Sequence, residues 1–175
     1  PKLLLLDEPS SGLNVEETDD MAFWIQDIKN ELGITVLMVE HDMSLVSKVS
    51  DRVLAMNQGE VLAMGSPREV QTDPAVVEAY LGSIDDAPPT RAGGCMSTLP
   101  PPISDQPVLK LSNVESAYGP IKAIRGVSLQ VRRGEIATVL GPNGAGKTTI
   151  LKTISGIIDP RKGSVEFKGQ DITAR

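Results

Sequence analysis

A glycine-rich segment near the end of the chain has residue types and spacing that could bind phosphate groups. Residues 141–148 read Gly-Pro-Asn-Gly-Ala-Gly-Lys-Thr, so that the first and last glycines lie five positions apart and are followed by Lys and Thr. An apolar run over 136–140 predicts a buried strand before this segment, and residues 148–158 have the pattern of a helix after it. Glycines let backbone N–H groups surround phosphates closely. The pattern therefore predicts a phosphate-binding loop at a strand-to-helix turn.

Side chains of this loop could also contact a nucleotide and its metal ion. Lys147 could reach the terminal phosphates, and the helix that follows would add the positive end of its dipole. Thr148 offers a hydroxyl oxygen to Mg²⁺. The predicted nucleotide-binding residues are Gly141, Pro142, Asn143, Gly144, Ala145, Gly146, Lys147, Thr148 and Thr149.

Two carboxylates follow an apolar run at the other end of the chain. Leu3–Leu6 is typical of a strand buried on both faces, and Asp7 and Glu8 come directly after it. Acids often occur where a strand enters a turn, so the pair alone is not specific. Because the chain also has a phosphate-binding loop, we predict that Asp7 holds Mg²⁺, directly or through water. Glu8 would then orient and deprotonate an attacking water.

One histidine and one tyrosine complete the candidate site. His41 is the only histidine and follows an apolar strand over 34–39, at the sheet edge where Glu8 is expected to emerge. A solitary histidine is often structural or exposed, but this position favours a contact to the γ-phosphate. We predict Glu8, His41 and Lys147 as catalytic residues. Tyr118 precedes a Gly-Pro turn and is either a surface tyrosine or a residue that stacks on adenine.

The surrounding pattern alternates strands and helices. Asn14 and Glu17 have the spacing of a capping box at the start of a helix that ends at Gly33. The apolar face expected for this helix consists of Met21, Trp24, Ile25, Ile28 and Leu32. Strands over 52–56 and 60–64 flank Asn-Gln-Gly and predict a hairpin. This alternation indicates an α/β fold.

Residues 83–107 separate two differently patterned segments. They contain Pro-Pro, Gly-Gly and Pro-Pro-Pro with little periodicity, which predicts a linker. The following residues, 108–175, open with antiparallel strands over 108–114 and 123–131. We therefore divide the chain into residues 1–82, the linker and residues 108–175.

The composition limits the class of protein and its partners. The net charge is −6 at pH 7, with acids concentrated in residues 1–82 and bases in 108–175. The basic segment lacks interleaved aromatics and a dense Arg/Lys run, so no nucleic-acid partner is predicted. No apolar stretch of about 18 residues encodes a membrane-spanning helix. The single cysteine, Cys95, fits a reducing cytosol, and the absence of an initial Met suggests a piece of a longer or processed chain.

Several motifs together resemble those of ABC-transporter ATPases. Residues 3–14, Leu-Leu-Leu-Leu-Asp-Glu-Pro-Ser-Ser-Gly-Leu-Asn, resemble the Walker B motif and D-loop of that family. Val-Glu-His-Asp over 39–42 resembles the H-loop. Tyr118-Gly119 resembles the A-loop, and residues 141–149 resemble the Walker A motif.

Two longer stretches narrow this resemblance and imply an unusual order. Residues 40–82, which end in Ala-Tyr-Leu-Gly, are similar to the C-terminal part of one ATPase of branched-chain amino-acid importers. Residues 108–175 are similar to the N-terminal part of the companion ATPase. In P-loop NTPases the phosphate-binding loop normally precedes the carboxylate strand, whereas here it follows it. The resemblance thus implies the C-terminal half of one ATPase domain, a linker, and the N-terminal half of another.

We expect these halves to pack together as a P-loop NTPase (ABC ATPase) core in permuted order. The strands Lys2–Leu6 and Ile34–Val39 would lie beside Ile136–Leu140 in a mostly parallel sheet, next to an antiparallel β-subdomain. The resemblance implies that the helical subdomain of the family is missing.

The resemblance also implies a function, cofactors and partners. It indicates an ATP-binding component of an ABC importer, with branched-chain amino acids as the implied solute and with ATP and Mg²⁺ as cofactors. The implied partners are a second ABC ATPase domain, integral-membrane permease subunits and, indirectly, a periplasmic or extracellular solute-binding protein. Such components are cytoplasmic and peripheral on the inner face of the cell membrane.

Departures from the family pattern set limits on catalysis. The Leu-Ser-Gly-Gly-Gln signature is not found, and Gln170 lies too early, in the wrong context, to be the Q-loop glutamine. Asn14 stands where many members have the D-loop aspartate. We expect nucleotide binding with very slow or absent hydrolysis. The alternatives are an inert module that binds a permease or partner ATPase, and a DNA-repair or chromosome ATPase, which the lack of coiled-coil heptads disfavours.

Overall fold

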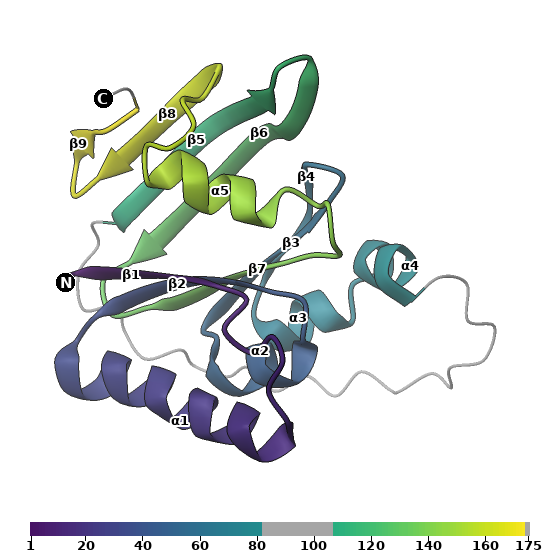
Figure 1. Ribbon diagram of the computed structural model, residues 1–175, viewed down its shortest axis with the longest axis vertical. Coiled ribbons are helices and arrows are strands. Elements are labelled where there is room, and N and C mark those ends of the chain that lie inside the picture. The colour runs from purple at the N-terminus through teal and green to yellow at the C-terminus, as the bar shows by residue number, and fades with distance from the viewer. Residues whose placement is uncertain (82–106, 174–175) are drawn as a thin grey trace.

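The computed structural model describes residues 1–81 and 107–173, which form two sheets with helices between and below them (Figure 1). All residues of the predicted linker except Pro107 lie outside the described residues. Cys95 is one of the residues that are not described. No helix in the described ranges is both long and apolar enough to cross a membrane.

The larger sheet combines strands from both segments of the chain. Its order is β1 (Leu3–Asp7), β2 (Thr35–Glu40), β7 (Ile136–Leu140), β3 (Arg52–Asn57) and β4 (Glu60–Gly65). Strand β7 runs parallel to β2 on one side and to β3 on the other, and only β4 is antiparallel to its neighbour. This topology confirms the permuted, mostly parallel core. It differs from expectation because, among the strands that the structure describes, β1 pairs with β2 and not with β7, while the hairpin strand β3 pairs with β7.

The smaller sheet is antiparallel, as expected. Its order is β6 (Ile121–Arg132), β5 (Pro107–Tyr118), β8 (Lys162–Phe167) and β9 (Gln170–Asp171). Helix α5 (Lys147–Ile154) lies between the two sheets (Figure 1). The side chains packed there come from both segments, and include Leu37 of β2, Val127 of β6 and Ile150 of α5, all fully buried. The two segments therefore share one hydrophobic core.

A second core lies on the opposite face of the larger sheet. The remaining helices are α1 (Val15–Leu32), α2 (Met43–Val49), α3 (Pro67–Gln71) and α4 (Pro74–Leu81). Along β2, Val36 and Met38 point into this core, whereas Leu37 and Val39 point toward α5, because successive strand residues face opposite sides. In the part of the chain that the structure describes, no group of helices stands apart from the sheets as a separate subdomain.

The apolar face of α1 is narrower than its sequence predicted. The capping box of Asn14 and Glu17 and the left-handed Gly33 at the end are present. Ile25 is buried, but Trp24 and Leu32 are 64% and 67% exposed, so their predicted place on the packed face is wrong. Adjacent helix residues are rotated by about 100° about the helix axis, so Trp24 points in a different direction from Ile25. Only the stripe of α1 to which Ile25 belongs faces the sheet.

Candidate functional site

The glycine-rich loop leaves β7 through a gap that accommodates no side chain. A Cβ atom on Gly141 would lie 2.8 Å from the Ala145 Cβ and 2.9 Å from the Met56 carbonyl oxygen. Gly146 has φ +99°, and a Cβ there would lie 2.5 Å from the carbonyl oxygen of Ala123 in β6. Both positions therefore require glycine, since the neighbouring atoms belong largely to the backbone.

The β3–β4 turn supports the loop from behind. The Gly59 N–H donates to the Ala145 carbonyl at 3.0 Å, and the Gly59 carbonyl accepts from the Arg125 N–H at 2.8 Å. The turn thus joins the loop to β6. This contact was not predicted, because the hairpin pattern specifies only the pairing of its own two strands.

An open cavity of about 550 Å³ lies over the loop and the start of α5. Among the described residues, no side chain caps the N-terminus of α5, so its first N–H groups are left for another acceptor. The lining residues are Asp7, Glu8, Ser11, Ala123, Asn143, Gly144, Gly146, Lys147, Thr148 and Thr149. The cavity therefore combines residues from both segments, and Ser11 and Ala123 were not predicted.

Lys147 connects the loop to the first strand. Its side chain is only 4% exposed, and Nζ donates to the Gly141 carbonyl at 2.8 Å and to the Pro142 carbonyl at 3.2 Å. The same nitrogen lies 3.2 Å from Oε1 of Glu8. A buried ammonium needs such partners, and here one of them is a carboxylate 139 positions earlier in the chain.

The predicted metal ligands also meet. The Thr148 hydroxyl donates to Oδ1 of Asp7 at 3.2 Å, so a hydroxyl and a carboxylate oxygen lie side by side at the start of α5. Mg²⁺ in nucleotide sites is usually held by one or two protein oxygens, and its remaining ligands are waters and phosphates. The chemistry of this pair fits such an ion.

Glu8 and His41 lie at the same edge of the larger sheet. Glu8 has φ +45°, a left-handed conformation that is strained for a residue other than glycine, and its N–H donates to the Val39 carbonyl at 2.9 Å. Oε1 of Glu8 is 3.7 Å from Nδ1 of His41, whose side chain is half exposed. The carboxylate is thus placed between an imidazole and the Lys147 ammonium.

A buried carboxylate that was not predicted holds this edge together. Glu40 is fully buried at the end of β2. Its Oε1 accepts from the Ser10 N–H at 2.9 Å, and its Oε2 accepts from the His41 N–H at 3.2 Å. The sequence feature that could have identified Glu40 is a charged residue at the end of a mainly apolar strand.

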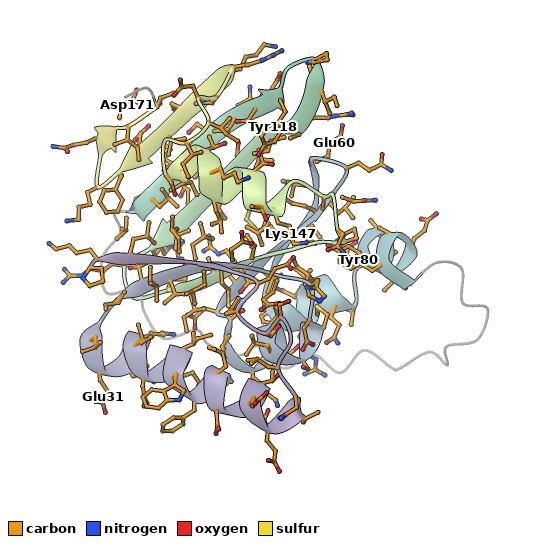
Figure 2. The ribbon with its side chains drawn as sticks, viewed as in Figure 1. Glu31, Glu60, Tyr80, Tyr118, Lys147 and Asp171 are labelled. Carbon is orange, nitrogen blue, oxygen red and sulfur yellow. The ribbon has the colours of Figure 1, made fainter. Side chains whose placement is uncertain are left out.

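Tyr118 lies away from the cavity, unlike most of the predicted site residues. It is 47% exposed at the β5–β6 turn, on the far side of α5 from Lys147, and Nζ of Lys152 lies 5.9 Å from its ring centroid (Figure 2). Gly141, Pro142 and Ala145 also lie outside the lining, at the back of the loop, and so does His41, which reaches the cavity only through its contact with Glu8. Adenine stacking by Tyr118 stays a prediction.

A glycine loop between a buried parallel strand and an uncapped helix, opposite a strand that ends in two carboxylates, defines a P-loop NTPase core. Comparison with protein families agrees with this class. Residues 124–175 match the family described as ABC transporter, and residues 60–86 match the family described as branched-chain amino acid ATP-binding cassette transporter. Over these residues the chain is similar to the ATP-binding proteins of ABC transporters.

Individual relatives match either part or nearly all of the chain. The high-affinity branched-chain amino acid transport ATP-binding protein BraF of Pseudomonas aeruginosa is 48% identical over 82 residues, which cover 47% of this chain and 32% of BraF. The peptidoglycan transport ATP-binding protein YejF of Agrobacterium fabrum is 32% identical over 186 residues, which cover 98% of this chain and 32% of YejF. The chain thus spans about a third of the length of these relatives.

Among solved structures, a nucleotide-free ATP-binding cassette from an ABC transporter is 36% identical to this chain. It covers 40% of this chain with a TM-score of 0.39, and the matched part is 28% of that structure.

Proposed function

We propose that this chain binds ATP with Mg²⁺ in the cavity between the glycine loop and the Asp7–Glu8 strand end. The observation that carries the proposal is the pairing of groups across the two segments. Lys147 contacts Glu8 at 3.2 Å, and Thr148 contacts Asp7 at 3.2 Å. Residues from opposite ends of the chain thus converge around one space of nucleotide size.

Each residue has a role that follows from its place. Lys147 and the first N–H groups of α5 bind the phosphates, which compete with Glu8 for the ammonium. Asp7 and Thr148 hold Mg²⁺, whose charge offsets that of the phosphate oxygens. Glu8 accepts a proton from water, and His41 contacts the terminal phosphate from the same edge.

We further propose that residues 1–82 are the end of one ATPase domain and that residues 108–175 are the start of a second, joined by the linker. The separate family matches support this, as does the alignment of YejF with both segments in a single stretch. The whole protein would then act with a partner ATPase domain and membrane permease subunits, at the inner face of the cell membrane. By likeness to BraF, its solute would be a branched-chain amino acid, taken up into the cell with the help of a solute-binding protein.

Calorimetric titration of the purified chain with ATP tests the proposal. We expect binding that requires Mg²⁺ and is lost in Lys147→Ala, with little or no hydrolysis. The matched control is Lys152→Ala, which removes a lysine from the same helix outside the cavity lining. An absence of Mg²⁺-dependent binding in the folded wild type would instead favour an inert interaction module.

A further inference from the structure

A tyrosine of helix α4 lies behind the glycine loop, outside the cavity. The Tyr80 hydroxyl is 2.7 Å from the carbonyl oxygen of Leu140 and 3.0 Å from that of Met56. Figure 2 shows Tyr80 and Lys147 on neighbouring parts of the molecule, with Tyr80 on the side of α4. Tyr80 belongs to the Ala-Tyr-Leu-Gly sequence, to which the proposed function assigns no role.

The two carbonyls lie where the central strand leaves the sheet. Leu140 pairs with Ala55 at the last register position between β7 and β3. The β3–β4 register also shifts between Ala55 and Met56. Leu140 and Met56 are fully buried, so water cannot supply a hydrogen bond to their carbonyl groups. Because the pairing between β7 and β3 also ends here, the donor must come from another part of the protein.

The same carbonyls form the base of the loop. The Met56 carbonyl lies against Gly141, where an added Cβ would be only 2.9 Å away. The Gly141 carbonyl in turn accepts from Nζ of Lys147 at 2.8 Å. A continuous chain of contacts thus runs from the Tyr80 hydroxyl through Leu140 and Gly141 to the ammonium that faces the cavity.

The Tyr80 hydroxyl is suited to act as a permanent donor. Burial raises the pKa of this hydroxyl well above its ordinary value, and the hydrogen bond to Met56 offsets only part of that effect. The group therefore keeps its proton throughout the neutral and moderately alkaline range.

We propose that Tyr80 is a positioning residue for the nucleotide site, because its hydroxyl holds the backbone from which the glycine loop and Lys147 are built. The proposal rests on the proposed function, since it concerns the affinity of that same site. It also assigns a role to α4, because this helix anchors the end of residues 1–82 to the loop of the other segment.

The test compares two variants that each remove one hydrogen bond to β7. Tyr80→Phe removes the hydroxyl at the loop end of the strand. Ser50→Ala removes the 2.6 Å contact between the Ser50 and Thr138 hydroxyls in mid-strand. Measured by calorimetry at a temperature where both variants are folded, Mg²⁺–ADP should bind Tyr80→Phe roughly fivefold or more weakly than wild type. Its affinity for Ser50→Ala should equal that for wild type.

The amide NMR spectrum gives a second measurement, which does not depend on the overall stability of the variants. The N–H resonances of Gly141, Gly144 and Lys147 should shift in Tyr80→Phe and stay in place in Ser50→Ala. Equal Mg²⁺–ADP affinities of wild type and Tyr80→Phe, or equal losses in both variants, would overturn the positioning role alone. Failure of the wild type to bind Mg²⁺–ADP would overturn the proposed function, and this inference with it.

Fluorotyrosine labelling of the unmutated chain covers the case in which Tyr80→Phe does not fold. The chain has two tyrosines, so the ¹⁹F signals are few and the exposed Tyr118 is distinguished by its broadening with a surface paramagnet. The Tyr80 signal should shift on addition of Mg²⁺–ADP although Tyr80 lies outside the cavity lining. A signal that stays in place while nucleotide binds would contradict the proposal.

Discussion

At the scale of single residues, the site holds a buried positive charge that already has a negative partner. Lys147 contacts Glu8 at 3.2 Å, and Glu8 is also 3.7 Å from Nδ1 of His41. A phosphate entering the cavity therefore competes with a carboxylate for the same ammonium. In the proposed function, Glu8 would therefore oppose binding of the anion whose hydrolysis it assists.

This competition predicts the effect of Glu8→Gln on nucleotide affinity. The variant keeps the side-chain shape and removes the charge, so Mg²⁺–ATP should bind at least as tightly as to wild type and up to roughly tenfold more tightly. Calorimetry measures the change. Glu166→Gln, which removes a carboxylate paired with Lys110 in the smaller sheet, should leave the affinity unchanged. Weaker binding by Glu8→Gln would show that Glu8 contributes to binding rather than opposing it.

The raised pKa of Tyr80 predicts that the stability of the protein depends on pH in the alkaline range. Its pKa in the folded chain is raised above the ordinary value of 10.0 by burial. The stabilising contribution is therefore complete below pH 10.0 and declines as the pH rises toward the folded-state pKa, because only the unfolded chain releases the proton there. Urea denaturation from about pH 9 to 11 should show a steeper loss of stability in wild type than in Tyr80→Phe. Parallel curves would contradict the assigned burial.

Residue types and short spacings predicted most of the residues that line the cavity. The glycine loop, Lys147, Thr148 and the Asp7–Glu8 pair carry side chains whose chemistry is visible in the sequence. Glu40 and Tyr80 were not predicted, because their partners are backbone N–H and carbonyl groups that every residue possesses. Only the fold decides which of those groups lie within reach.

At the scale of elements, α1 shows how periodicity identifies a helix without fixing the width of its packed face. Residues at spacings of three and four predicted the helix and its ends correctly. The larger sheet meets only the stripe that contains Ile25, which is 1% exposed, whereas Trp24 is 64% exposed. Which apolar residues are buried depends on the tilt and height of the helix over the sheet, and these are tertiary properties.

Substitutions on α1 distinguish the two faces. Ile25→Ala should lower the free energy of unfolding by about 2–5 kcal/mol, because it leaves a cavity under the helix. Trp24→Ala should change it by no more than about 0.5 kcal/mol despite the larger side chain removed. Chemical denaturation followed by far-UV circular dichroism measures both values. A large loss for Trp24→Ala would mean that this side chain packs against the protein.

At the scale of the whole molecule, the two segments depend on each other for a core. The permuted order was predictable, since both halves carried recognisable strands. The place of β3 beside β7 was not, because a hairpin pattern specifies a local antiparallel pair and no distant parallel neighbour. Strand order is set by the global packing of apolar faces.

A shared core predicts cooperative unfolding across the segments. Leu37→Ala, in fully buried β2, should cost about 3 kcal/mol. Amide exchange should then show the same loss of protection in β7 as in β2 itself. Strand β7 begins at Ile136, 99 positions after Leu37. Loss of protection confined to residues 1–81 would indicate that the segments unfold independently.

The interior position of β7 has a consequence for biosynthesis. Translation produces β1–β4 before residues 136–140, which form β7. Until β7 has been made, the position between β2 and β3, where β7 pairs with both strands, is vacant. Such a vacant position has two unpaired edges and accepts any matching strand, including the β7 of a second molecule. High concentration during refolding should therefore favour strand-exchanged dimers over the monomer.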